Sequence, residues 1–220
     1  MMGGRIRVVN APGGNASWAG DVRLDVNSTI EIRANQTLRL NGVMGGTGAL
    51  RKEGFGTLWR ANSSILRGNT TVAEGTLRLD YGANGASKLA DAATLVLGGG
   101  RGGGVLDIVG GTTAIREDVR DLFLAIGSNR ITRSDPTSNT ILRLNNVTIS
   151  QGGILDLGTS GLAQTDRNNY RGILGAWLTV GGTDWATNST NGNDGSINAF
   201  TTYVPNTWAP GNQTTVTTNA

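Results

Sequence analysis

The sequence predicts an all-β chain that coils into a parallel β-solenoid. Three observations lead to this prediction: short runs in which apolar and polar residues alternate, Gly- and Asn-rich breaks between the runs, and short strand-like sequence motifs that recur along the chain. Alternation with period two sends one set of side chains inward and the other outward. Because each run is too short to bury a core alone, neighbouring runs have to stack.

The alternating runs recur over most of the chain. In Thr-Leu-Arg-Leu at 76–79, the pleat points Leu77 and Leu79 inward and Thr76 and Arg78 toward water. We expect each such run to be a strand with one buried face. Runs of this kind occupy residues 29–33, 37–40, 57–60, 76–79, 94–97, 105–109, 141–144 and 154–157.

Glycine- and asparagine-rich segments separate the runs, and the chain holds 35 Gly but only 4 Pro. Glycine adopts positive φ without steric cost, so such segments reverse the chain within a few residues. This spacing suits a sandwich, an antiparallel barrel or a parallel solenoid. Thr-Leu-Arg-Leu occurs at 37–40 and 76–79, and Leu-Arg-Leu-Asn at 38–41 and 142–145. Repeated sequence motifs favour the solenoid, since a sandwich does not require them.

Two segments depart from this rhythm. Residues 112–119 carry more charge and predict a short helix or a loop between solenoid turns. From Asp184 onward the chain becomes polar and poor in aliphatic residues. We therefore divide the chain into a β-solenoid at 1–183 and a polar partial rung or linker at 184–220.

The composition excludes several kinds of site. The chain has no Cys and no His, which excludes thiol nucleophiles, Ser-His triads, zinc fingers and zincin motifs. Its net charge is +3 and its Arg residues are scattered, without a basic stripe interleaved with aromatics, so we expect no nucleic-acid partner. We expect no cofactor and no metal site. No segment is apolar and long enough for a signal-peptide core or a membrane span, so an export signal is expected elsewhere in a longer parent protein.

Residues 40–79 carry the most specific pattern. Gly-Thr-Gly-Ala-Leu-Arg-Lys-Glu-Gly-Phe-Gly-Thr-Leu at 46–58, followed by Asn-Thr-Thr-Val-Ala-Glu-Gly-Thr-Leu-Arg-Leu at 69–79, resembles the autotransporter-associated β-strand repeat, also called the passenger-associated transport repeat. The pair Trp59-Arg60 departs from that pattern and is interpreted as an outward-facing variation. Residues 131–186 are similar to spacer segments of very large proteins that carry many such repeats.

The resemblance implies a right-handed parallel β-helix that is exported to the cell surface or across the outer membrane. It carries no catalytic residues, and we expect a structural, surface-exposed passenger segment, with adhesion as one role, and not an enzyme. Two alternatives remain: a β-helical carbohydrate-active enzyme and a glycan-binding adhesin module. The expected partners are other rungs of a longer parent protein and surface or glycan ligands, and unpaired solenoid ends predict end-to-end self-association.

Two carboxylates are of the kind that serves as acid and base in a β-helical lyase or hydrolase. Asp107 and Asp156 lie at alternating positions in strands, and the alternation predicts both on the solvent-exposed face. Because they fit an ordinary strand pattern, no pair is assigned as catalytic.

Two further features suggest binding. Gly98–Gly104, interrupted by Arg101, resembles a phosphate cradle, but a strand is expected to follow it where a phosphate loop opens a helix, so we interpret it as a turn. Tryptophans near turns could stack on sugars or pack over a solenoid edge. They are Trp18, Trp59, Trp177, Trp185 and Trp208.

Overall fold

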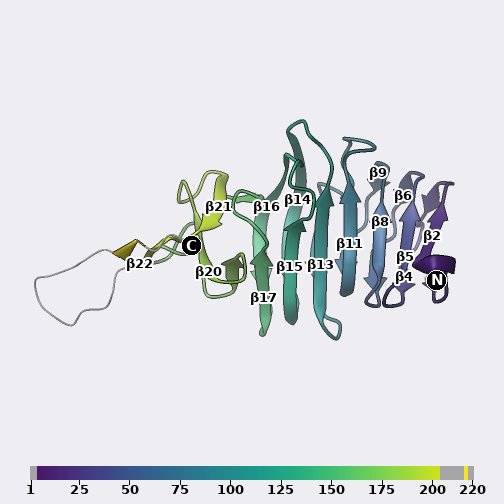
Figure 1. The fold of residues 1–220 in the computed structure, drawn as a ribbon, viewed down its shortest axis with the longest axis horizontal. Coiled ribbons are helices and arrows are strands. Elements are labelled where there is room, and N and C mark those ends of the chain that lie inside the picture. The colour runs from purple at the N-terminus through teal and green to yellow at the C-terminus, as the bar shows by residue number, and fades with distance from the viewer. Residues whose placement is uncertain (1–3, 204–215, 218–220) are drawn as a thin grey trace, which may run out of the picture.

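The strands of this chain coil into a parallel β-solenoid of about seven turns, as the sequence predicts (Figure 1). The computed structural model describes residues 4–203 and 216–217. In Figure 1 the strands stand side by side along the long axis, from the purple N-terminal end to the yellow-green C-terminal end. A 3₁₀ turn spans Pro12–Gly14. No helix among the described residues is long and apolar enough to cross a membrane.

Each rung consists of one strand of sheet A followed by one strand of sheet B. Sheet A contains β1 (Arg5–Val8), β4 (Ser28–Ile32), β7 (Leu50–Glu53), β10 (Thr70–Val72), β12 (Thr94–Leu97), β14 (Ile115–Leu124), β16 (Thr140–Ile149) and β18 (Ala163–Thr165). Sheet B contains β2 (Asn15–Trp18), β5 (Thr37–Leu40), β8 (Thr57–Arg60), β11 (Glu74–Asp80), β13 (Gly103–Val109), β15 (Gly127–Arg133), β17 (Gly153–Leu157) and β19 (Leu178–Val180). Within each of these two sheets, consecutive strands pair in parallel, so the backbone hydrogen bonds run along the solenoid axis.

Inward side chains of successive rungs form continuous rows. In sheet B, register partners place Leu58 beside Leu77, Leu77 beside Leu106 and Leu106 beside Ile131, and all four are fully buried. Burying a Leu or Ile side chain contributes about 1.5–3 kcal/mol, so these rows supply much of the driving force for stacking. The alternating burial matches the predicted inward assignment of Leu77.

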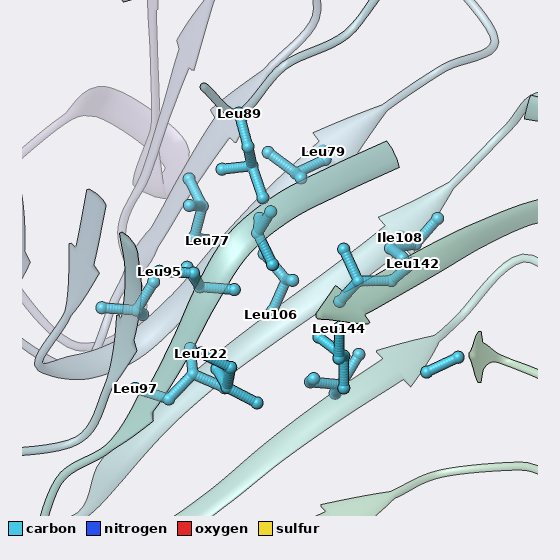
Figure 2. Close-up of a cluster of buried hydrophobic side chains, with 14 of the residues drawn as sticks. Leu77, Leu79, Leu89, Leu95, Leu97, Leu106, Ile108, Leu122, Leu142 and Leu144 are labelled. Atoms are coloured by element: carbon cyan, nitrogen blue, oxygen red, sulfur yellow. The ribbon is translucent and has the colours of Figure 1, made fainter. Parts of the chain in front are cut away.

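The rows of the two sheets meet inside the solenoid. Figure 2 shows Leu77 and Leu106 of sheet B beside Leu95 and Leu122 of sheet A, all within one buried cluster. A rung therefore completes its core only through its own second sheet and its neighbours, which explains why no rung can fold alone.

Two glycines illustrate how closely the backbones of successive rungs approach. Gly54 has φ of 72°, and a Cβ at this position would lie 2.3 Å from the carbonyl oxygen of Ile32. A Cβ at Gly104 would lie 2.0 Å from the carbonyl oxygen of Val72. These positions require glycine, which accounts for the Gly-rich corners between sheets A and B.

A third face exists over the early rungs only. Sheet C contains β3 (Val22–Arg23), β6 (Met44–Gly46) and β9 (Ser64–Leu66), paired in parallel. After β9, the loop at 81–93 takes its place, and the Ser64 amide donates to the carbonyl of Ser87. The third side of later rungs is formed by loops.

The C-terminal end is arranged differently from the rungs. β20 (Asp184–Asn188) pairs antiparallel with β19, and β21 (Gly195–Ala199) pairs antiparallel with β18 and β20. Ala186 and Ile197 of this hairpin are buried. β22 (Thr202–Tyr203) and β23 (Val216–Thr217) form a separate antiparallel pair. The hairpin covers the end of the core, and it lies in the segment predicted as a partial rung or linker.

One sequence-based expectation holds only in part, and another is wrong. Residues 112–119 contain no helix: residues 112–114 form a loop, and strand β14 begins at Ile115, with its buried positions changing phase between Val119 and Leu122. The inward position that would normally be apolar is occupied by Glu117, which hides the period from a sequence reading. Arg60 does not face outward: it is 2% exposed and shares an inward row with Leu40 and Leu79, while Trp59 alone points outward.

The two repeated sequence motifs differ in where their copies lie in the solenoid. The two copies of Thr-Leu-Arg-Leu lie in register on sheet B, with β8 between them, so Leu38, Leu58 and Leu77 form one row. The second copy of Leu-Arg-Leu-Asn begins in β16, on sheet A. A repeated motif therefore indicates a shared strand pattern. Of the two motifs, only Thr-Leu-Arg-Leu marks strands that stack in the same sheet.

Candidate binding surface

The outer face of sheet B carries most of the polar side chains that the sequence singles out. Outward positions of successive rungs form rows, because the strands pair in register. One row contains Arg39, Trp59, Arg78, Asp107 and Thr132. A parallel row contains Thr57, Thr76, Val105, Arg130 and Asp156.

Trp59 is held between two arginines of this face. The guanidinium carbons of Arg39 and Arg78, on the strands to either side, lie 4.4 and 5.0 Å from the centroid of its ring. Its indole N–H donates to Asp80 Oδ2 over 3.0 Å. Cation–π contacts of this geometry stabilise the face. A sugar could stack on this ring only after displacing an arginine.

The other described tryptophans lie elsewhere. Trp18 is in the first rung and is 56% exposed. Trp185 is on β20 and is 40% exposed, while Trp177, just before β19, lies under the guanidinium of Arg167. The tryptophans do not assemble into one platform, and Trp208 lies outside the described residues.

Asp107 is buried, although the sequence predicts it on the solvent-exposed face. It points outward from sheet B but is only 2% exposed, because side chains of the neighbouring rungs cover it. Its Oδ2 accepts from Arg78 Nε at 2.8 Å and from Ser134 Oγ at 2.8 Å, and its Oδ1 accepts from Thr132 Oγ1 at 2.8 Å and the Ser134 amide at 3.1 Å. The carboxylate ties three rungs together.

Asp156 has a similar role one row away. It pairs with Arg130 Nε at 3.0 Å and accepts from Thr179 Oγ1 at 3.0 Å and from the Gly182 amide at 2.6 Å. Asp107 and Asp156 lie in different outward rows, on β13 and β17, with β15 between them. Each carboxylate is thus occupied by its own arginine and hydroxyl donors, and the two do not face each other as a pair.

A groove of about 440 Å³ lies on this face where strands β13, β15 and β17 end. Arg78 and Asp107 form one wall, and Arg130 and Arg133 lie on the following rung. Hydroxyl groups complete the lining, from Thr76, Thr132, Ser134 and Thr159. The groove therefore offers guanidinium and hydroxyl groups to a ligand, a set suited to a polar molecule with acceptor oxygens.

Sequence reasoning missed this groove. Thr132, Arg133 and Ser134 are ordinary residues at the end of a strand, and their position beside Asp107 depends on the register between β13 and β15. The nearest signal in the sequence is Asp107 itself, an acidic residue in an otherwise apolar strand.

The Gly98–Gly104 segment is a turn that leads into β13, as predicted. Its backbone amides bind within the solenoid: the Gly98 amide donates to Val72 O, the Arg101 amide to Glu74 Oε1, and the Gly104 amide to Asn129 Oδ1. Amides used in this way are not available to cradle a phosphate.

The chain is similar over part of its length to an autotransporter adhesin. Over 98 residues it is 40% identical to the adhesin BmaC autotransporter of Brucella suis, and the match covers 37% of this chain and 3% of that adhesin. No family model matches the chain, and no solved structure matches it. The similarity and the β-solenoid together fit the autotransporter passenger repeats that residues 40–79 resemble.

Proposed function

We propose that this chain is a surface-exposed passenger segment of a secreted bacterial repeat protein, and that it adheres to glycans through the outer face of sheet B. The observation that carries the proposal is the parallel solenoid with a polar, grooved lateral face, in a chain partly similar to an adhesin. Its location would be the cell surface or the outside of the outer membrane.

The fold suits this role because stacking makes a stiff support. Hydrogen bonds between rungs repeat about every 4.8 Å along the axis, and the inward rows form one continuous core. Outward side chains are held in register with the same spacing. A lateral face of this kind presents many weakly binding groups at fixed distances, which favours multivalent contact with a polymer.

We propose adhesion in preference to enzymatic turnover. Asp107 and Asp156 are each engaged by an arginine and by hydroxyl or amide donors, and they do not form a facing pair. The adhesin would therefore bind its glycan without cleaving it.

The proposed partners include further solenoid rungs at the N-terminal end. β1 pairs with β4 and β2 with β5, each with a neighbour on one side among the described residues. Ile6 and Trp18 belong to inward rows there, yet are 45% and 56% exposed. Unpaired strand edges over exposed apolar side chains are a surface on which further strands can stack.

Adhesion can be tested with the chain immobilised on beads and exposed to an array of polysaccharides and to host cells. We expect saturable binding without release of oligosaccharides. Arg130→Glu should weaken binding, because Arg130 lies on the grooved face and is 52% exposed. Arg120→Glu is the matched control, since Arg120 is also exposed and paired with an aspartate but lies on sheet A. Absence of saturable binding, or cleavage of the polysaccharide, would overturn the proposal.

A further inference from the structure

A second groove lies at the corner where the rungs turn from sheet A into sheet B. It has a volume of about 470 Å³ and is lined from five successive rungs. Arg5 and Arg7 belong to the first rung, Phe55 to the third and Arg101 to the fifth. The groove on sheet B lies where β13, β15 and β17 end, whereas this corner groove lies beside the turns that lead into sheet B. The two grooves are therefore separate sites.

The ring of Phe55 forms an apolar part of the corner groove. Phe55 lies in the turn between β7 and β8 and is 54% exposed. The ring reaches the turn of the fifth rung, since a Cβ at Gly102 would lie 3.1 Å from its Cε1. The amide of Arg101 holds that turn in place by donating to Glu74 Oε1 at 2.8 Å. The ring is thus supported at one edge, and more than half of the residue stays open to a ligand.

Two glutamates of the corner groove are paired with arginines, and these pairs fix where the guanidinium groups lie. Arg5 donates to both Glu31 and Glu53, and Arg7 donates to Glu31 at 3.0 Å. Arg51 adds a further donor to Glu53 at 2.7 Å. The side chains of Arg5 and Arg7 are 56% and 64% exposed, so both keep N–H groups for a ligand.

The third glutamate, Glu74, is occupied by the backbone. It accepts from the Gly54 amide at 3.2 Å and from the Arg101 amide at 2.8 Å. Arg33 and Arg101 also line the corner groove and are exposed, and neither side chain is paired with a carboxylate among the described residues. Arginines outnumber glutamates in this groove, so it presents a positive charge beside the aromatic ring.

An aromatic ring next to exposed guanidinium groups matches the two sides of an acidic sugar. The C–H face of a sugar ring is apolar and packs against the face of an aromatic side chain, while carboxylate oxygens accept from guanidinium N–H groups. An acidic peptide would use the arginines without the ring. A neutral sugar would use the ring without the arginines.

From these observations we propose that the corner groove binds an acidic saccharide, with one sugar ring against Phe55 and its carboxylate against the exposed arginines. The choice of a saccharide rests on the proposed adhesive function, and the corner groove adds a site to the face of sheet B. Its position along the axis lets one linear polymer contact several rungs.

The test uses isothermal titration calorimetry on the full chain with three probes: oligogalacturonate, a neutral galactan oligosaccharide of equal length, and an oligoglutamate peptide. We expect oligogalacturonate to bind and the other two to bind much more weakly. Phe55→Ala and Arg101→Gln should each weaken this binding by about tenfold, the loss expected for one stacking or one charge-assisted contact. Phe55→Tyr, which keeps the ring, should bind like the parent.

Matched controls come from the third face of the solenoid. Ile65 is an apolar residue of β9 that is 69% exposed, and Arg67 is an exposed arginine without a carboxylate partner among the described residues. Ile65→Ala and Arg67→Gln should leave the affinity unchanged. Melting temperatures are measured for every variant, and all should match the parent, because each replaced side chain is exposed.

Three outcomes would overturn the inference. The first is that oligogalacturonate does not bind, or that the neutral or peptide probe binds as tightly. The second is that Phe55→Ala or Arg101→Gln loses no more affinity than its matched control. The third is that Phe55→Tyr binds no better than Phe55→Ala, which would mean that the aromatic ring is not in contact with the sugar.

The bead assay separates this inference from the proposed function. If oligogalacturonate does not bind but the beads adhere and Arg130→Glu weakens adhesion, the corner groove fails and the proposed function stands. If oligogalacturonate binds through Phe55 while Arg130→Glu leaves adhesion unchanged, the corner groove stands and the site proposed on sheet B fails.

Discussion

The carboxylate of Glu117 accepts a hydrogen bond from the hydroxyl of Tyr81 inside the solenoid, although Glu117 belongs to β14 and Tyr81 follows β11. The same carboxylate accepts from Ser87 Oγ at 2.9 Å and from the amides of Lys88 and Leu89 at 3.0 and 2.7 Å. Burial raises the pKa of Glu117, and these hydrogen bonds oppose the rise. Glu117 thus fastens the loop at 81–93 onto the core where sheet C has ended.

Replacing Glu117 with Gln should unfold this attachment. The amide nitrogen of Gln would face donors, so at least one buried hydrogen bond would be lost, and we expect the free energy of unfolding to fall by about 3 kcal/mol. Urea denaturation measures the change, and hydrogen exchange should show early opening of residues 82–92. Asp25→Asn is the control, because Asp25 is an exposed acid paired with Arg23. Equal stability of the two variants would contradict the attachment.

The inward leucines could be placed from the sequence because alternation is a local property. Leu58 and Leu77 follow from period two alone, whatever the neighbouring rung does. Arg60 and Glu117 occupy inward positions as well, but their partners come from another part of the chain: Arg60 donates to the carbonyl of Lys88, and Glu117 binds the same loop. A pattern of apolar residues cannot reveal a charge that is compensated by a distant loop.

The groove could not be predicted for a related reason. Register partners of successive rungs lie from 19 residues apart, as Thr57 and Thr76, to 29 apart, as Arg78 and Asp107, so the sequence does not fix which side chains become neighbours. Asp107 and Arg78 meet because β11 and β13 pair in one register, and a slip of β13 by one residue would turn Asp107 toward the core and away from Arg78. Lateral surfaces therefore need the structure, while the core rows do not.

Leu77→Asp tests the core rows directly. Leu77 is fully buried between Leu58 and Leu106, so an aspartate would place an unpaired charge in the row, and we expect a loss of about 4 kcal/mol or more. Thr57→Asp is the matched control, because Thr57 lies on the outward side of β8. It should change stability by about 0.5 kcal/mol at most. A melting temperature of Leu77→Asp close to that of the parent would mean that Leu77 is not in the core.

Lys52 should make stability depend on pH. It lies in the inward row between Ile30 and Val72, and its ammonium donates to the carbonyls of Glu53, Gly54 and Glu74. Burial lowers its pKa to about 8 from an unperturbed 10.5. Between these values the unfolded chain holds the proton and the folded chain does not, so the contribution of Lys52 to stability rises with pH through that window.

The measurement is the free energy of unfolding from pH 7 to pH 10.5 for the parent and for Lys52→Met. The variant should lose the part of the pH slope that Lys52 contributes, and it should be about 2 kcal/mol less stable near pH 7, because three carbonyls lose their donor. Arg51→Gln, next to it on the outward side, should keep the slope. Identical slopes in the parent and Lys52→Met would show that Lys52 keeps an ordinary pKa.

The open N-terminal end should drive self-association. Ile6 is in register with the buried Ile30 and is 45% exposed, with a paired strand on one side only. Ile154 is 49% exposed but points outward on β17, in the middle of a paired sheet. We expect the parent to associate as its concentration rises in sedimentation velocity runs, Ile6→Lys to remain monomeric, and Ile154→Lys to associate like the parent. If the parent stays monomeric throughout, or if the two variants associate equally, the end of the solenoid is not the contact. Ile6 and Ile154 are similarly exposed, but only Ile6 lies at unpaired strand edges.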